Sequence, residues 1–233
     1  MLHFADKVPV VAGERILRVR ALAEARRAFR HPPGWNALVI RGLGMVSARI
    51  PALRQAYLPY PWPRLYEAPY SVASVVFERD FAGEPATFMA PLVQPESRPL
   101  AEIQRKVQGW KDDPIDSHGV LRRIVRNAKP PRPVRRLIWA MGLYGDGFLR
   151  ARNFGTFAVN SIAGTRGKML MFKTAITSVW YYSLATKGEM LIQIAFDHRV
   201  FDGSTAGRAM SELESVFNNE LLAEVRNSST GSG

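Results

Sequence analysis

The clearest periodic patterns lie in the last third of the chain. Apolar residues dominate three short runs, 155–162, 176–185 and 190–197, which predict three β-strands. The period then changes to that of a helix over 204–225, where Ala, Met, Leu, Val and Phe recur on one side. This order of strands followed by a closing helix is typical of an α/β fold.

The first half of the chain contains both strand-like and helix-like patterns. Apolar residues among arginines in the first forty positions suit one or two helices, and the run 36–42 reads as a short strand. Segments 71–79 and 86–93 flank a turn that contains Gly83, which predicts a β-hairpin. Helical spacing returns over 100–110.

Residues 114–152 form a distinct basic segment with two amphipathic stripes, separated by a proline-rich break at 130–133. The stripes are Val120, Leu121, Ile124 and Val125, then Val134, Leu137, Ile138 and Met141. The basic residues of the segment include Arg122, Arg123, Arg126, Lys129, Arg132, Arg135 and Arg136. Two interpretations remain open: the stripes pack on the core with solvated arginines behind them, or they face an anionic membrane surface or an acidic partner.

Length and composition bound the possible classes of protein. The chain has 233 residues, 47% of them hydrophobic, and no cysteine. Disulfides, cysteine-bound metals and thiolate nucleophiles are therefore excluded, and no metal site is expected. No apolar run approaches the ~20 residues of a transmembrane helix, and the start of the chain lacks a secretory signal. We expect a soluble, cytoplasmic protein in which residues 1–226 form one domain and 227–233 a flexible tail or cloning remnant.

The net charge of +12 comes from two basic zones: residues 1–60 contain ten Lys or Arg and three acidic residues, and residues 118–152 contain nine and one. Such a balance suits a polyanion: the phosphates of coenzyme A, anionic lipid headgroups or a nucleic acid. No nucleic-acid-binding motif accompanies the charge, so we expect no nucleic-acid partner.

One histidine stands where a reaction would need it. His198 directly follows the last predicted strand, and a rigid sheet fixes a side chain at its edge. Imidazole is the natural general base near neutral pH. Asp202, four residues later, is placed to bind an arginine or backbone amides and so fix the loop, and Gly203 allows a tight turn before the helix. Arg199 is expected to have a structural role in the same motif.

The segment Phe196–Gly203, FDHRVFDG, closely resembles the HxxxDG signature of dihydrolipoyl acyltransferases of 2-oxo-acid dehydrogenase complexes. The same core occurs in chloramphenicol acetyltransferase. Upstream, GTFAVNS at 155–161 and PLVQPESRPLAEIQRKV at 91–107 resemble further segments of that family. The resemblance covers about residues 36–113 and 153–225.

This resemblance implies an α/β, chloramphenicol-acetyltransferase-like mixed-sheet sandwich with flanking helices, assembled as a homotrimer whose active sites lie between subunits. It further implies that His198 removes a proton from a hydroxyl or thiol acceptor as the acceptor attacks a thioester. Without cysteine there is no covalent thioester-enzyme, so the acyl group would pass directly within a ternary complex.

The chain departs from the family pattern in three places. The family has Ser or Thr where this chain has Asn160, followed by Ser161. An amide can also donate to an oxyanion, and neighbours on a strand face opposite ways, so only one of the two residues points into the site. We expect no lipoyl or subunit-binding domain before the catalytic part, and the basic segment 114–152 is longer than the corresponding connection in the family.

We therefore expect an acyl-CoA-dependent acyltransferase that uses coenzyme A thioesters as co-substrate and no bound cofactor. Its acceptor would be a hydroxyl, amine or thiol on a small molecule or lipid, and the donor would be acyl-CoA or an acyl carrier. The alternative is a catalytically silent relative that acts as a scaffold or assembly subunit. Retention of both His198 and Asp202 favours catalysis.

Overall fold

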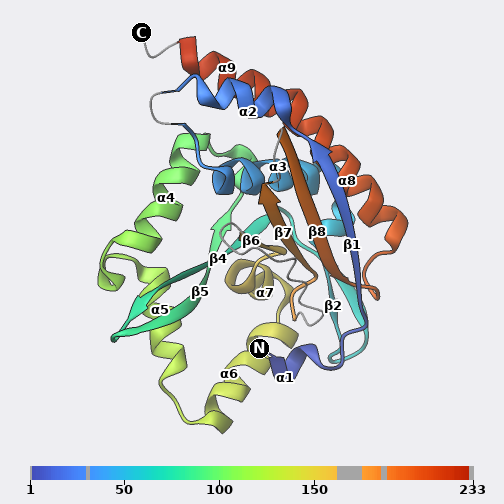
Figure 1. Ribbon diagram of the computed structural model, residues 1–233. Helices are drawn as coiled ribbons and strands as arrows, with labels where there is room; N and C mark the ends of the chain where they lie inside the picture. The colour runs from blue at the N-terminus through green and yellow to red at the C-terminus, as the bar shows by residue number, and fades with distance from the viewer. Residues whose placement is uncertain (1, 30–31, 162–174, 185–187, 231–233) are drawn as a thin grey trace.

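The computed structural model describes residues 2–29, 32–161, 175–184 and 188–230. Its centre is a six-stranded mixed sheet in the order β1-β8-β7-β6-β4-β5 (Figure 1). The strands are β1 (Val10–Arg18), β4 (Val72–Phe81), β5 (Glu84–Val93), β6 (Phe157–Ser161), β7 (Ser178–Leu184) and β8 (Glu189–Asp197). A separate two-stranded sheet pairs β2 (Gln55–Leu58) with β3 (Arg64–Glu67).

Helices cover both faces of the sheet. They are α1 (Leu2–Ala5), α2 (Arg20–Arg27), α3 (Trp35–Arg49), α4 (Leu100–Asp112), α5 (Gly119–Ala128), α6 (Arg132–Tyr144), α7 (Gly147–Phe154), α8 (Gly203–Asn218) and α9 (Glu220–Thr230). In Figure 1, α2 and α9 lie together at one end of the molecule and α6 lies at the other.

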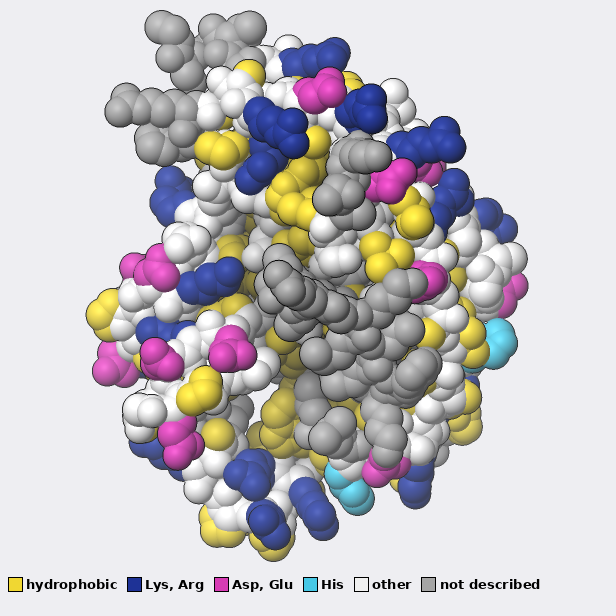
Figure 2. Space-filling model, in the orientation of Figure 1, with side chains coloured by type: hydrophobic (Ala, Val, Ile, Leu, Met, Phe, Trp, Pro, Cys, Tyr) yellow, Lys and Arg dark blue, Asp and Glu magenta, His cyan; other side chains and the backbone are white. Residues whose placement is uncertain are grey.

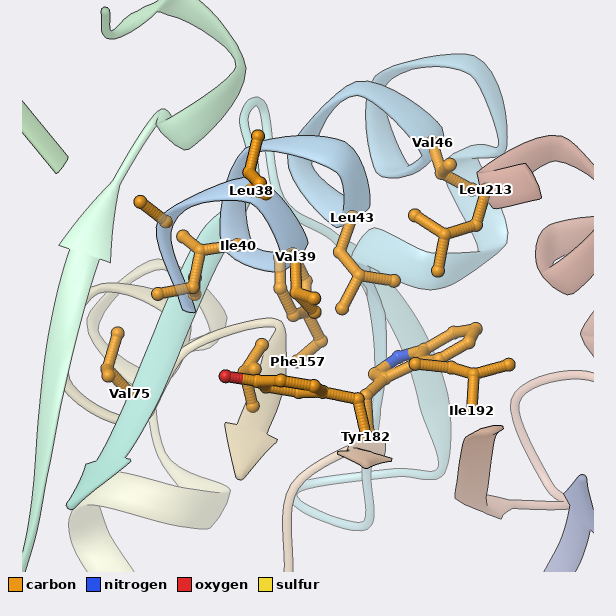
Figure 3. Close-up of a cluster of buried hydrophobic side chains, with 14 of the residues drawn as sticks. Leu38, Val39, Ile40, Leu43, Val46, Val75, Phe157, Tyr182, Ile192 and Leu213 are labelled. Atoms are coloured by element: carbon orange, nitrogen blue, oxygen red, sulfur yellow. The ribbon is translucent and has the colours of Figure 1, made fainter. Parts of the chain in front are cut away.

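The main core lies between the sheet and α3. Apolar side chains of α3 and α8 pack on those of the inner strands, and Figure 3 shows Leu43 facing Phe157, Tyr182 and Ile192. Burying each large apolar side chain stabilises the fold by about 1.5–3 kcal/mol. The opposite face carries a smaller cluster, Ala158, Ile176, Val179 and Tyr181, with Val76 and Met89 beside it.

The predicted strand at 36–42 is wrong, because this run belongs to α3. Its residues are buried on nearly every side, since α3 packs against the sheet, α4 and α8. A helix enclosed in this way shows no polar stripe, and a short apolar run does not distinguish such a helix from a buried strand.

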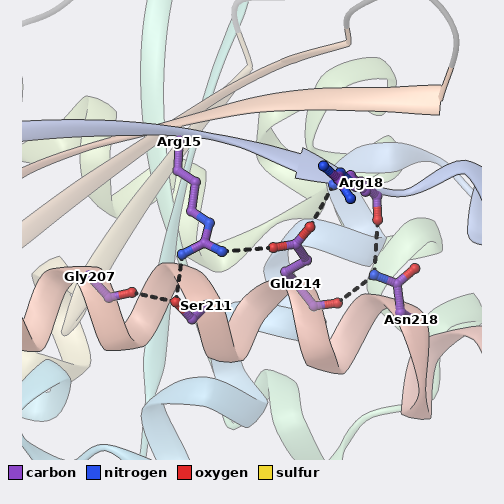
Figure 4. Close-up of polar contacts among 6 residues, drawn as sticks. All are labelled: Arg15, Arg18, Gly207, Ser211, Glu214 and Asn218. Carbon is purple, nitrogen blue, oxygen red and sulfur yellow. Dashed lines mark hydrogen bonds and ion pairs between the residues drawn. The ribbon is translucent and has the colours of Figure 1, made fainter.

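The helical reading of the first forty residues was incomplete, because strand β1 lies between α1 and α2. Polar contacts tie β1 to α8 (Figure 4): Arg15 donates to Ser211 over 2.6 Å and contacts Glu214 at 3.2 Å, and the Arg18 N–H donates to the Glu214 carboxylate over 2.9 Å. Arginine and glutamate in a strand obscure its alternation, so this edge strand was not recognised.

The other predicted elements are confirmed. Strands β4 and β5 form the hairpin around Ala82 and Gly83, both at positive φ, as a two-residue hairpin turn requires. The predicted helix at 100–110 is α4, and the predicted strands near 155–162, 176–185 and 190–197 are β6, β7 and β8, although 162 and 185 lie outside the described residues. The closing helix is divided at Asn219 into α8 and α9, and α9 continues four residues into the predicted tail.

The two amphipathic stripes of the basic segment differ in their surroundings. On α5, Leu121 is buried, and Val120, Ile124 and Val125 pack against the main core. On α6, Val134, Leu137 and Met141 are 49%, 59% and 58% exposed. Core packing therefore accounts for the stripe of α5 and not for that of α6.

Candidate active site

His198 lies in the loop that joins β8 to α8. Its N–H donates to the Pro9 carbonyl over 2.9 Å, and its Nδ1 lies 3.2 Å from the Phe201 carbonyl oxygen. A carbonyl only accepts hydrogen bonds, so Nδ1 carries the proton and, in the neutral ring, Nε2 keeps a free lone pair. The exposed imidazole thus presents a proton acceptor outward.

Aromatic side chains pack beneath the loop, on the side of the protein core. The rings of Phe196 and Phe201 stack with centroids 4.7 Å apart, and the His198 ring meets Phe196 edge-on at 6.1 Å. Both phenylalanines are buried, whereas His198 lies at the surface. The exposed histidine is therefore held by buried aromatic neighbours.

Asp197 and Arg199, on either side of the histidine, form a two-point ion pair. Arg199 Nε and Nη2 donate to the two Asp197 carboxylate oxygens over 2.9 and 2.8 Å, and the Arg199 N–H donates to the same carboxylate over 3.0 Å. The Arg199 guanidinium also lies 4.2 Å from the ring centroid of Tyr57. The hydrogen bonds that Arg199 donates to Asp197 raise the pKa of Arg199 above its usual range.

A second arginine, Arg150 on α7, is buried near this pair and donates to the Ala175 carbonyl over 3.1 Å. Burial lowers its pKa to about 10, while the negative charge of Asp197 opposes that shift. Arg150 thus remains charged at neutral pH. No motif marked it, because it belongs to a helix some fifty residues upstream of the histidine.

Of the two partners expected for Asp202, an arginine or backbone amides, the structure shows a backbone amide. It caps α8, accepting a hydrogen bond from the Thr205 N–H over 2.8 Å and from the Ser204 hydroxyl at 3.0 Å. These bonds lower its pKa to about 2. Within the described part of the chain no arginine pairs with Asp202, and the ion pair of the loop is formed by Asp197. An aspartate at the N-cap of a helix satisfies a free backbone amide of the first turn locally.

The expectation for Gly203 also needs correction. Its φ lies outside the left-handed region, and a Cβ placed there would meet no described atom within 4 Å. Neither the turn nor the packing of this chain therefore requires glycine at 203.

The structure distinguishes the two candidate oxyanion donors. Asn160 lies opposite Tyr181 on β7, on the same face as Ala158 and Val179, whereas Ser161 lies opposite Tyr182. Ser161 hydrogen-bonds Tyr182 on the face toward α3. Asn160 is therefore the residue that faces the outer side of the sheet.

Asn160 lines a pocket of about 690 Å³ between this outer face and helices α5, α6 and α7. Its neighbour Tyr181 lines the same pocket and is 2% exposed, and its hydroxyl has no hydrogen-bond partner among the described residues. Burial raises the pKa of Tyr181 to about 12, which keeps the hydroxyl protonated. Sequence reasoning did not identify Tyr181, because it lies within an apolar aromatic strand.

Within one chain, His198 and Asn160 lie well apart. Asn160 is level with Tyr181 and, one strand further, with Gln193, which precedes the histidine by five residues. Five residues of strand span about 16 Å, and two strand spacings add about 10 Å sideways. Both side chains of one protomer thus cannot contact the same reacting carbonyl.

Two further properties concern the described residues as a set. They contain no group of three or more His, Asp or Glu side chains placed to hold a metal ion. None of their helices combines the length and hydrophobicity needed to cross a bilayer.

Comparisons with known proteins match no family model and no curated protein sequence. Several solved structures resemble this chain over most of its length. A probable dihydrolipoamide acetyltransferase from Listeria monocytogenes has a TM-score of 0.64 at 14% identity, over 92% of this chain and 86% of that one. The Azotobacter vinelandii dihydrolipoamide acetyltransferase has a TM-score of 0.65 at 13% identity, over 94% and 85%.

A chloramphenicol acetyltransferase is also similar, with a TM-score of 0.52 at 12% identity over 92% of both chains. The predicted fold class is thereby confirmed. The chain has the mixed-sheet fold shared by dihydrolipoamide acetyltransferases and chloramphenicol acetyltransferase.

Proposed function

We propose that this protein is an acyltransferase in which His198 is the general base. The observation that carries the proposal is the hydrogen bond between His198 Nδ1 and the Phe201 carbonyl, because it leaves Nε2 as the proton acceptor. The similar Azotobacter vinelandii enzyme supports it: a histidine and an asparagine four residues apart were investigated there for their roles in catalysis. His198 and Asp202 have the same spacing here.

The proposed reaction is a direct transfer of the acyl group from the thioester to the acceptor. His198 Nε2 takes the proton of the acceptor hydroxyl, amine or thiol as that atom attacks the thioester carbonyl. The carbonyl π electrons move to oxygen, which forms a tetrahedral oxyanion. When the carbonyl re-forms, the carbon–sulfur bond breaks, and the leaving thiolate takes the proton from the imidazolium. Acyl group, proton and electrons balance, and no covalent acyl-enzyme is needed.

We assign oxyanion stabilisation to the Asn160 amide of a neighbouring subunit. The separation between His198 and Asn160 along the sheet prevents one chain from supplying both groups. A trimer in which each site combines the histidine of one protomer with the asparagine of the next satisfies this constraint. One donor to the oxyanion contributes about 2.7–4 kcal/mol of transition-state stabilisation.

The donor is a coenzyme A thioester or an acyl carrier, and the basic segment would bind its phosphates. The exposed stripe of α6 suits an anionic membrane surface, from which a lipid-like acceptor could be delivered. Figure 2 shows Lys and Arg side chains beside hydrophobic ones at this lower end of the molecule.

A panel of acyl-CoAs with release of free thiol as the readout tests the enzymatic proposal. Replacing His198 by Ala should slow transfer about 10²- to 10⁴-fold, because the general base is lost. Transfer by His198→Ala at the parental rate would refute the mechanism. A protein that releases no thiol from any donor and acceptor pair would instead be the catalytically silent scaffold.

A further inference from the structure

The pocket beside Asn160 is large and mostly apolar. Its floor is the outer face of the sheet, with Ala158 and Val179, and its walls include Ile138 and Trp139 of α6 and Phe154 of α7. Pockets that bind small molecules commonly measure about 300–1000 Å³, so about 690 Å³ is a full-sized site. An acetyl group would leave nearly all of it unfilled.

Few polar side chains line this pocket. Asn160 and the unpartnered Tyr181 hydroxyl lie on the floor. Arg123 and Arg135 line the helical walls, and Arg135 donates to the Ala128 carbonyl over 3.1 Å. Neither arginine forms an ion pair within the described part of the chain, so their charges fit an anionic group of the occupant.

We propose that this pocket binds the acyl chain of a long-chain acyl thioester, which makes the protein selective for long-chain donors. This inference rests on the proposed acyltransfer, because the thioester carbonyl would lie at Asn160. The apolar walls exclude water from the chain, while the two arginines receive the phosphates of the donor. The basic segment 114–152 thereby gains a function, since α5 and α6 supply those walls.

Binding can be measured without turnover. His198→Ala protein is titrated with CoA thioesters of two, four, eight, twelve and sixteen carbons, below their micelle concentrations, and the fluorescence of Trp139 and the other tryptophans is followed. Affinity should rise about fourfold for each methylene buried, and level off when the pocket is full. Similar affinities for the two-carbon and sixteen-carbon thioesters, within about threefold, would overturn the proposal.

Two substitutions narrow the pocket at different depths. Ala158→Leu fills the floor, and Ala128→Trp fills the exposed rim, where a larger side chain does not disturb the core. Each should weaken binding of the sixteen-carbon thioester at least tenfold and leave the two-carbon thioester within twofold. Ala223→Trp is the matched control, because Ala223 is an exposed helical alanine of α9 that does not line the pocket.

The outcomes separate the two proposals. Binding that depends on chain length, and that Ala158→Leu or Ala128→Trp removes, would support the pocket. This holds even if the parental protein transfers no acyl group from any thioester. That second result would refute only the enzymatic proposal. Transfer from acetyl-CoA and palmitoyl-CoA with equal kcat/KM, and with no effect of either substitution, would refute the pocket and leave the acyltransferase standing.

Discussion

His198 is positioned by atoms from separate parts of the chain. The Pro9 carbonyl fixes its backbone and the Phe201 carbonyl fixes its ring. The bidentate pair of Asp197 and Arg199 holds the residues on both sides of it. Because Asp197 is buried, its charge-assisted bonds are poorly screened, and we infer that it positions the base.

Replacing Asp197 by Asn should reduce kcat much more than it changes KM, because the loop loses its ion pair while the binding surface remains. The buried hydrogen-bonded group left without its charged partner should cost about 1–3 kcal/mol in free energy of unfolding. Chemical denaturation and steady-state kinetics measure the two effects. Asp113→Asn is the control, since the Asp113 side chain is 52% exposed and its ion-pair partner among the described residues is His118. Unchanged kcat in Asp197→Asn would contradict a positioning role.

Asp202 should stabilise the protein in a pH-dependent way. Its folded pKa is lowered to about 2 by bonds from Thr205 and Ser204, so the ionised form is favoured in the folded state. This contribution is fully present above the ordinary aspartate pKa of about 3.9 and is lost as the pH falls through about 2. The difference in urea midpoint between parent and Asp202→Ala should therefore be constant from pH 7 to 5 and shrink by pH 3.

Asp202→Asn supplies the control for that experiment, because an asparagine side chain still caps the helix but does not titrate. Its urea midpoint should stay closer to that of the parent than the midpoint of Asp202→Ala does at pH 7. A gap between parent and Asp202→Ala that is equally large at pH 3 would show that the cap owes nothing to its charge.

Sequence reasoning reached some of these residues and not others. It identified His198 because a motif of fixed spacing surrounds it. The family resemblance supplied Asn160 and Ser161 as candidate oxyanion donors, and the alternation of strand neighbours allowed only one of them to face the site. It did not identify Arg150 or Tyr181. Their significance comes from burial beside groups distant in sequence, and no local pattern encodes such proximity.

Whole helices and strands were predictable where the local pattern has a single interpretation. The hairpin β4–β5 and the helix α4 show a period that matches their geometry. The strands β6, β7 and β8 are mostly buried, and short apolar runs marked them. Helix α3 was misread because it is enclosed on nearly all sides, and β1 because its polar residues pair with α8. In both cases tertiary contacts, which the local pattern does not contain, decide the conformation.

Helix α6 should bind anionic membranes through its exposed stripe and its arginines. Each basic residue near such a surface contributes roughly 1 kcal/mol, and the apolar side chains add to this by insertion. The protein should co-sediment with phosphatidylserine vesicles at low salt and less at high salt. Leu137→Ser with Met141→Ser should weaken binding, whereas Ile16→Ser, at a 57% exposed residue of β1, should not.

Absence of vesicle binding at low salt would remove the membrane interpretation of α6. Retained binding after both α6 substitutions would instead place the contact elsewhere on the basic surface. Another subunit could instead cover Leu137 and Met141. In that case the double substitution would remove a subunit contact, and sedimentation would show a lower oligomeric state for the substituted protein.

An active site shared between chains of the trimer can be recognised by complementation between two inactive variants. His198→Ala and Asn160→Ala protomers are each impaired alone, but a mixed trimer contains interfaces where intact His198 meets intact Asn160. Trimers that contain both variants should have about a third of parental activity, because one of the three interfaces in each of them combines the two intact groups. Co-expression with two affinity tags, followed by tandem purification and thiol-release assay, measures this.

The individual variants purified from the same cells are the controls for complementation. Activity of the mixture no higher than the mean of the two single variants would show that each chain carries its own complete site. A monomer in sedimentation with activity intact would contradict the shared site in a second way.

The pairing of β1 with β8 has a consequence for biosynthesis. Gly13 lies opposite Ile194, so two segments from opposite parts of the sequence must meet before the sheet is complete. The loop with His198 depends on that meeting, since Pro9 supplies its backbone partner. Pairings between segments so distant in sequence form late and slowly. During translation we therefore expect β1 to stay without its partner strand until β8 has been synthesised, and an unpaired strand edge exposes a nascent chain to aggregation.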